Sequence, residues 1–103
     1  MLFMHTLVNA EIIRLNCKDT KSDYNLMLAI NTSAKSVVMN ETYMSNVSIS
    51  DSRIYFEMEI VEKSRGDRWT HSINRTTGVL TLQRLPDENM AFFQCSKVTV
   101  NKF

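Results

Sequence analysis

The sequence predicts an all-β fold, namely a small antiparallel barrel or sandwich of seven or eight short strands connected as a meander. Two observations indicate this. Apolar residues alternate with polar ones at a period of two in several segments, and turn-forming residues separate those segments about every ten residues. A chain of 103 residues, 44% of them apolar, suits a single core, which we place at residues 11–103. Because an open sheet would expose an apolar face and two edges, we expect the strands to close up or stack.

The segment that precedes this domain, residues 1–10 (MLFMHTLVNA), resembles the end of a secretory signal peptide. Its apolar stretch ends in Val8, Asn9 and Ala10, which is similar to the small-x-Ala pattern of a cleavage site. We therefore expect a truncated signal peptide or an N-terminal extension, and a periplasmic or secreted protein. A cytoplasmic location is the alternative, because the segment lacks a basic beginning and is shorter than a complete apolar region.

The first expected strand carries one of the two cysteines. Ile13, Leu15 and Cys17 alternate onto one face, and Phe93 and Cys95 do the same near the other end of the chain. Both thiols should point inward, so a disulfide can form if the two strands are neighbours. The alternative is a pair of separate buried thiols in a cytosolic protein, since free cysteine is among the most buried residue types.

Five further strands are expected from the same alternation. Their inward residues are, strand by strand, Tyr24, Leu26, Leu28 and Ile30; Tyr43, Val47 and Ile49; Ile54, Phe56, Met58 and Ile60; Trp69, His71 and Ile73; and Leu80 and Leu82. In the second of these strands Met44, Asn46 and Ser48 should face away from the core. Residues 19–23, 40–41, 50–52 and 64–67 are rich in Ser, Asp, Asn and Gly and are expected to form turns. Between residues 33 and 39 the periodicity is ambiguous and also fits a helix of one or two turns.

A tight hairpin is expected at Asn74, Arg75, Thr76, Thr77 and Gly78, with a positive φ at Gly78. The last strand should run through residues 90–100. A bulge is expected within it, because Phe93 and Cys95 fit one register whereas Val98 and Val100 fit the other.

The hairpin and the residues after it carry a family resemblance. The chain has Ile73, Asn74, Arg75, Thr77, Gly78 and Leu80, then Cys95, Lys97 and Val98, and a closing Lys102 and Phe103. In this it resembles small uncharacterised exported proteins of Gram-negative marine bacteria and their phages, which have an early Cys and an Ile-x-Arg-x-Thr-Gly hairpin before the second Cys. The resemblance covers the last thirty residues and residues 15–18. It implies export and an all-β fold, and it supplies no activity.

The expected architecture is also similar to that of periplasmic lysozyme-inhibitor barrels, whose two ends are joined by a disulfide. Their inhibitory Ser-Gly-x-x-Tyr loop is absent here, and Ser50, Asp51, Ser52, Arg53, Ile54 and Tyr55 match it only loosely. Inhibition of a cell-wall hydrolase is therefore kept as an alternative function, because similarity of fold alone does not establish function.

Two constellations suggest catalysis, and each also has a structural interpretation. Cys95, His71 and an Asp or Asn would make a nucleophilic trio, but a disulfide would remove the nucleophile and the strand pattern favours a structural histidine. Glu57 and Glu59 share a strand face, as a glycan-acting enzyme requires. Arg53 and Lys63 share that face too, which favours a solvated, mixed-charge surface.

Metal and nucleic-acid sites are not expected. His5, His71, Cys17 and Cys95 lack the close paired spacing of metal ligands, and no motif indicates a cofactor. The net charge is only +1, and the basic run Arg65, Arg68, Arg75 and Arg84 is diluted by Asp67, Asp87 and Glu88.

The sequence therefore predicts a non-enzymatic exported β module that binds a protein or an envelope glycan through loops at the barrel mouth, or serves as an accessory protein on a phage or cell envelope. A pocket that contains His71 or a buried carboxylate would favour an enzyme, and a protruding loop with exposed aromatic residues would favour the inhibitor.

Overall fold

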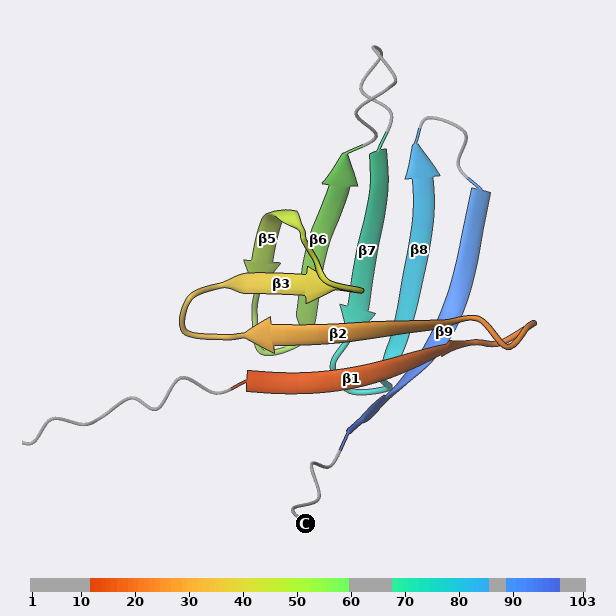
Figure 1. Ribbon diagram of the computed structural model, residues 1–103, viewed down its shortest axis with the longest axis horizontal. Helices are drawn as coiled ribbons and strands as arrows, with labels where there is room; N and C mark the ends of the chain where they lie inside the picture. Colours follow the sequence, from red (N-terminus) through yellow and green to blue (C-terminus); the bar gives the residue numbers. More distant parts are fainter. Residues whose placement is uncertain (1–11, 60–67, 86–88, 99–103) are drawn as a thin grey trace, which may run out of the picture.

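The computed structural model describes residues 12–59, 68–85 and 89–98, and confirms the all-β class. Nine antiparallel strands form one continuous sheet in the described residues, whereas seven or eight were expected (Figure 1). They are β1 (Ile12–Asp19), β2 (Asn25–Asn31), β3 (Ser36–Met39), β4 (Thr42–Tyr43), β5 (Ser45–Ile49), β6 (Arg53–Glu59), β7 (Arg68–Asn74), β8 (Val79–Leu85) and β9 (Asn89–Lys97). The predicted leader at residues 1–10 and the turn at 64–67 lie outside the described residues.

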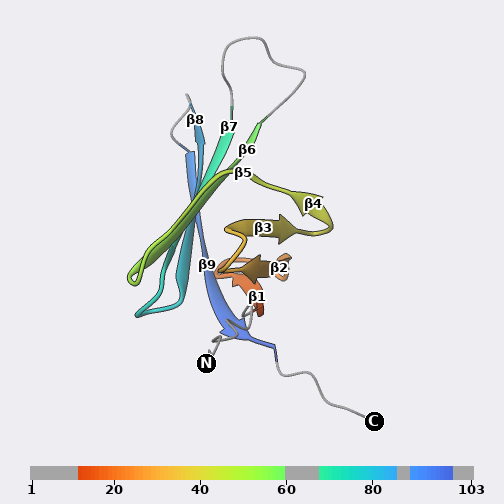
Figure 2. The same ribbon diagram turned by 90° about the vertical axis from the view of Figure 1, so that its left-hand side faces the viewer.

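The sheet curls into a nearly closed barrel at β9, whose two parts pair with different strands. Its first part, Asn89 to Gln94, is paired with β8, and its last part, Phe93 to Lys97, is paired with β1. Strands β5 to β9 thereby form one wall, which β1, β2 and β3 cross at a steep angle (Figures 1 and 2). The sheet order ends at β4 on one edge and at β5 on the other.

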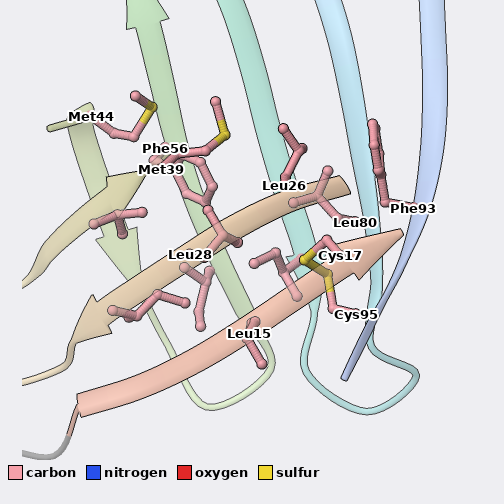
Figure 3. Packing of buried hydrophobic residues seen from close by; sticks show 14 residues of the cluster. Leu15, Cys17, Leu26, Leu28, Met39, Met44, Phe56, Leu80, Phe93 and Cys95 are labelled. Atoms are coloured by element: carbon pink, nitrogen blue, oxygen red, sulfur yellow. A yellow bond between two sulfur atoms is a disulfide. The ribbon is translucent and has the colours of Figure 1, made fainter. Parts of the chain in front are cut away.

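The core lies between these two walls. Its largest fully buried side chains are Phe56, Phe93, Ile30 and Leu80. Figure 3 shows Leu26 and Leu28 of β2 facing the strands behind them, with Met39, Met44 and Phe56 gathered towards one side. Most inward residues predicted for β1, β2, β6 and β9 are buried, and Ile13 and Met58 are partly buried against the core, which confirms the two-residue alternation there. Tyr24 is the exception: it precedes β2 and is 57% exposed, so its predicted inward orientation is wrong.

The short helix considered for residues 33–39 is not formed, and no helix occurs in residues 12–59, 68–85 and 89–98. Residues 32–35 form a turn, with Lys35 at φ 55°, and Ser36–Met39 is strand β3. Val37 lies opposite Ile30 and is fully buried, so a β-branched residue fills the pleated core face here. Asn40 and Glu41 then have φ 49° and 73°, as a two-residue type I′ hairpin requires.

The orientation predicted around β5 is wrong on one side of Ser45. Met44 is buried and Tyr43 is 77% exposed, the reverse of the expectation, whereas Val47 and Ile49 pack against the core as expected. The register between β5 and β6 shifts between Ser45 and Ser48, with Asn46 at φ 51°. This bulge exchanges the two faces of the strand. The bulge expected in the last strand is absent between Asn89 and Lys97, where the register is continuous; Val100 lies outside the described residues.

Candidate functional site

The two cysteines form the expected disulfide. Cys17 and Cys95 are direct partners in the β1–β9 register, and their sulfur atoms are bonded across 78 residues of sequence separation. Both are buried (Figure 3). The bond therefore ties together the strands nearest the two ends of the chain, inside the core, and leaves neither thiol available as a nucleophile.

The predicted hairpin between β7 and β8 is formed and is held by its own side chains. The Asn74 Oδ1 atom accepts hydrogen bonds from the backbone N–H groups of Thr76 and Thr77, at 2.9 and 3.1 Å. Gly78 has φ +79°, and its carbonyl accepts the N–H of Cys95 at 2.8 Å. A Cβ at position 78 would lie 3.0 Å from the Cys95 carbonyl oxygen, so glycine is needed for both its φ and its size.

This hairpin rims a shallow concavity at one end of the barrel, which we call the hairpin mouth. It measures about 340 Å³ and is lined by Ile13, Leu15, Ile54, Ile73, the hairpin residues, Cys95 and Lys97. Arg75 bends away to donate from Nη1 to the Ser50 carbonyl at 2.6 Å. The predicted site residues are thus adjacent in space, but their polar groups mostly satisfy the turn itself, which indicates a structural role.

The acidic candidate Glu57 is part of a hydrogen-bonded network on the outer face. Tyr55 donates its hydroxyl to Glu57 Oε2, Asn46 donates to Oε1 at 2.7 Å, and Arg68 Nε lies 3.6 Å from Oε2. The hydrogen bond from Tyr55 lowers the pKa of Glu57 most, and the hydrogen bond from Asn46 and the charge of Arg68 lower it further, whereas burial acts in the opposite direction. Since a general acid needs a raised pKa, this carboxylate is unsuited to protonate a glycosidic oxygen. The side chain of Glu59 lies outside the described part.

The imidazole of His71 lies at the far end of the barrel interior, in what we call the His71 pocket. The pocket measures about 270 Å³ and is lined by Tyr24, Leu26, Met39, Met58, Trp69, His71 and Leu82. His71 is 1% exposed and stacks on Phe56, with ring centroids 4.7 Å apart. Burial lowers the pKa of His71 to about 4, a trend that a hydrogen-bonding contribution from the Phe56 backbone only partly opposes. No carboxylate or thiol lines the pocket among the described residues, so the imidazole has no catalytic partner there.

The arginines that cluster in the sequence are separated in space. Arg68 is next to Glu57 on the outer face, and Arg84 lies over the ring of Trp69 at 5.5 Å. Arg75 is at the opposite end of β7 from Arg68, about 20 Å away for a seven-residue strand. Arg65 lies outside the described residues. A shared patch for nucleic acid does not form from the three that are described. Within the same part of the chain, no group of His, Cys, Asp or Glu suits a metal ion and no helix is long and apolar enough to cross a membrane.

The loose match to an inhibitory loop has no projecting aromatic residue. Ser50, Asp51 and Ser52 form the β5–β6 turn, and Tyr55 lies within β6 with its hydroxyl on Glu57. The aromatic residue that would have to project from a loop is therefore held on the sheet, so this feature of the inhibitor family is not reproduced.

A surface that the sequence did not reveal crosses the outer side of β1, β2, β3 and β4. Arg14 is paired with Ala29, Ala29 with Val38, and Val38 with Tyr43, while the Val98 N–H donates to the Arg14 carbonyl at 2.9 Å. Because directly opposite residues point to the same face, these side chains form one row. We call the apolar members of this row, together with the adjacent Met27, the outer strip: Met27, Ala29, Val38, Tyr43 and Val98.

The outer strip is exposed and hollowed. Tyr43 is 77% exposed, Met27 49% and Val98 38%. A groove of about 460 Å³ runs along it, lined by Arg14, Met27, Leu28, Ala29, Val38, Asn40, Glu41 and Val98. The β3–β4 turn holds its edge, because Asn40 Oδ1 accepts the Met27 N–H at 2.9 Å and Asn40 N–H donates to the Met27 carbonyl at 2.9 Å. No family model, curated protein or solved structure matches this chain. The function must therefore be inferred from the physical character of such surfaces.

Sequence patterns missed the outer strip for a definite reason. Met27 and Ala29 occupy the positions between inward residues, where polar side chains are the rule, and Tyr43 was placed inward. The signal that was available is that β2 reads as a nearly continuous apolar run from Leu26 to Ile30. Such a run indicates a strand covered on both faces, and here one of the faces is uncovered.

Proposed function

We propose that this protein is an exported, non-enzymatic β module that binds a protein partner through its outer strip. The observation that carries this proposal is a contiguous row of exposed apolar side chains along a groove, across four neighbouring strands of one wall. Monomeric soluble proteins rarely expose large contiguous apolar patches unless the patch is an interaction site. The partner would be a component of the cell envelope or of a phage particle, which makes the module an accessory protein there.

The chemistry of the outer strip favours a protein over an envelope glycan. Aromatic residues and methionine are enriched at the centres of protein interfaces, and Tyr43 and Met27 are the two most exposed large members of the strip. The charged groups at the groove, Arg14 and Glu41, are few and of opposite sign. They suit a polar rim around an apolar centre better than a site for polyhydroxyl chains.

Export is supported by the buried disulfide. Structural disulfides form and persist in oxidising compartments and are rare in the cytosol, where thiols are kept reduced. The resemblance of the hairpin and the second cysteine to exported bacterial and phage proteins points in the same direction, as does the cleavage-like pattern near residue 10.

The test is a paired pull-down from an envelope extract. Bait proteins would carry Met27→Ser with Tyr43→Ser, or the control pair Met90→Ser with Phe92→Ser. Met90 and Phe92 are 53% and 43% exposed on the outer face of β9, away from the outer strip, so both variants remove exposed apolar area. A partner retained by the parent and the control but lost by the strip variant supports the proposal. A partner that binds all three proteins equally, or loss with both variants, contradicts it.

Inhibition of a cell-wall hydrolase such as lysozyme and glycan-acting catalysis remain the rival functions. Both are decided by activity measurements: addition of the purified protein to lysozyme with bacterial cell walls as substrate, and incubation of the protein alone with the same walls. Inhibition or wall cleavage that survives Met27→Ser with Tyr43→Ser would replace the proposal.

A further inference from the structure

The barrel interior contains a second concavity that protein binding at the outer strip does not use. The His71 pocket is formed by side chains from both walls: Leu26 and Met39 come from β2 and β3, and Met58, Trp69, His71 and Leu82 come from β6, β7 and β8. Figure 3 shows Leu26 and Met39 among the buried side chains of the core. Tyr24, at the rim, is 57% exposed, so the pocket opens to the surface.

The walls of the His71 pocket are apolar and partly soft. Two of its lining residues are methionines, whose flexible thioethers adapt to irregular shapes and contact aromatic rings favourably. The ring of Trp69 is supported by the guanidinium of Arg84 at 5.5 Å. A volume of about 270 Å³ exceeds the engineered apolar cavities of about 150 Å³ that take up benzene. The pocket therefore has room for a bicyclic hydrocarbon skeleton.

One polar atom of the lining residue His71 lacks a hydrogen-bond partner of standard geometry. The Nδ1 atom of His71 is buried and makes no hydrogen bond of standard distance and angle, and the contribution of the Phe56 backbone only partly offsets the cost of burying the ring. With its lowered pKa the ring is neutral at pH 7, so one ring nitrogen donates and the other accepts. A hydroxyl group both donates and accepts, and therefore satisfies Nδ1 in either tautomer.

We propose that the His71 pocket binds a small, neutral, largely apolar molecule that carries one hydroxyl group, with the hydroxyl on His71 Nδ1 and the skeleton against Met39, Met58 and Trp69. A carboxylate or an amine is disfavoured, because the described walls offer no buried opposite charge for it. The site is separate from the outer strip, so the two can be occupied together.

The proposal is tested with borneol, a bicyclic alcohol, and bornane, the same skeleton without the hydroxyl. Trp69 is the only tryptophan, so its fluorescence reports the pocket directly, and both probes are transparent at the wavelengths used. We expect saturable changes with both probes and binding of borneol about tenfold tighter than that of bornane, the value of one good hydrogen bond. His71→Leu should remove that preference, whereas Ser72→Ala, on the opposite face of β7, should retain it.

The outcomes are distinct. Absence of a saturable change with either probe overturns the site, and equal affinities of borneol and bornane for the parent overturn the role of His71. If His71→Leu does not fold, Leu82→Phe fills the pocket with an apolar ring instead, and it must weaken both probes for the site to stand. Binding of borneol by Met27→Ser with Tyr43→Ser should equal that of the parent, so failure here is separable from failure of the outer strip.

Discussion

Reduction of the disulfide should destabilise the protein strongly without changing its fold. The bond joins residues 78 apart in sequence, so its reduction frees a loop of nearly the whole domain in the unfolded state. The chain-entropy relation gives about 4.5 kcal/mol at 25 °C for a loop of that length. This is comparable to the total stability of a small domain. Strand pairing of β1 with β9 does not depend on the sulfur bond, so the reduced folded state should retain its β-sheet signal.

The assays are thermal and urea unfolding of oxidised and reduced protein, each followed by far-ultraviolet circular dichroism and by Trp69 fluorescence. A loss of this size should lower the melting temperature by on the order of 20 °C, since each kcal/mol corresponds to roughly 4 to 8 °C in a domain of about 100 residues. The urea dependence should also steepen on reduction, because the unlinked unfolded chain exposes more surface.

The control is Cys17→Ala with Cys95→Ala, which should resemble the reduced parent and should not respond to reductant. Equal urea midpoints for the oxidised and reduced parent would refute the reasoning. That result would mean either that the bond does not form or that the unfolded chain gains nothing from its loss.

Three further predictions concern single sites. Gly78→Val should destabilise the protein by at least about 1 to 2 kcal/mol, because a side chain at φ +79° is strained and its Cβ meets the Cys95 carbonyl. Urea midpoints measure this loss. Gly78→Asn should lose less stability, because asparagine tolerates a positive φ. The pKa of Tyr55 is raised to about 12, chiefly by burial and then by its hydrogen bond to Glu57. Because the unfolded chain loses this proton first, stability should fall as the pH rises from about 10. Absorbance titration of tyrosinate should show one late step, and Glu57→Gln should move that step to lower pH. The pKa of His71 is about 4 in the folded protein and about 6.5 in the unfolded chain, so stability should fall as the pH drops from about 6.5 to 4. Urea midpoints measured against pH should lose this dependence in His71→Leu. An unchanged dependence would contradict the assignment.

The sequence was most informative where one face of a strand is buried and the other is wet. Ile54, Phe56 and Met58 alternate with charged or hydroxylated neighbours, and β6 has the predicted orientation over its described side chains. Gly78 was assigned a positive φ from turn chemistry alone, and the structure confirms it. In both cases a local rule and the global packing demand the same conformation.

It was least informative where a register changes or a strand has two apolar faces. The positive φ of Asn46 reverses the orientation of Met44 relative to Val47, and nothing in the residue pattern marks the position of such a bulge. The exposure of Met27 depends on which elements cover β2, and that is a property of the whole topology. The outer strip was therefore hidden from sequence patterns, whereas the disulfide and the hairpin were predicted.

The barrel has two seams, and they differ in what holds them together. The seam between β1 and β9 is closed by a continuous ladder and by the buried disulfide. The opposite seam lies between β4 and β5, which are consecutive along the chain and end the sheet order. Met44, between them, continues the β3–β4 ladder, because its N–H donates to the Val37 carbonyl at 2.9 Å. Met39, on the strand beside β4, also lines the His71 pocket. The pocket therefore has one wall at Leu26, which pairs with the disulfide-bonded Cys17, and another at Met39, on the side that sulfur does not fix. The disulfide can thus stabilise the barrel without tying the Met39 side of its interior.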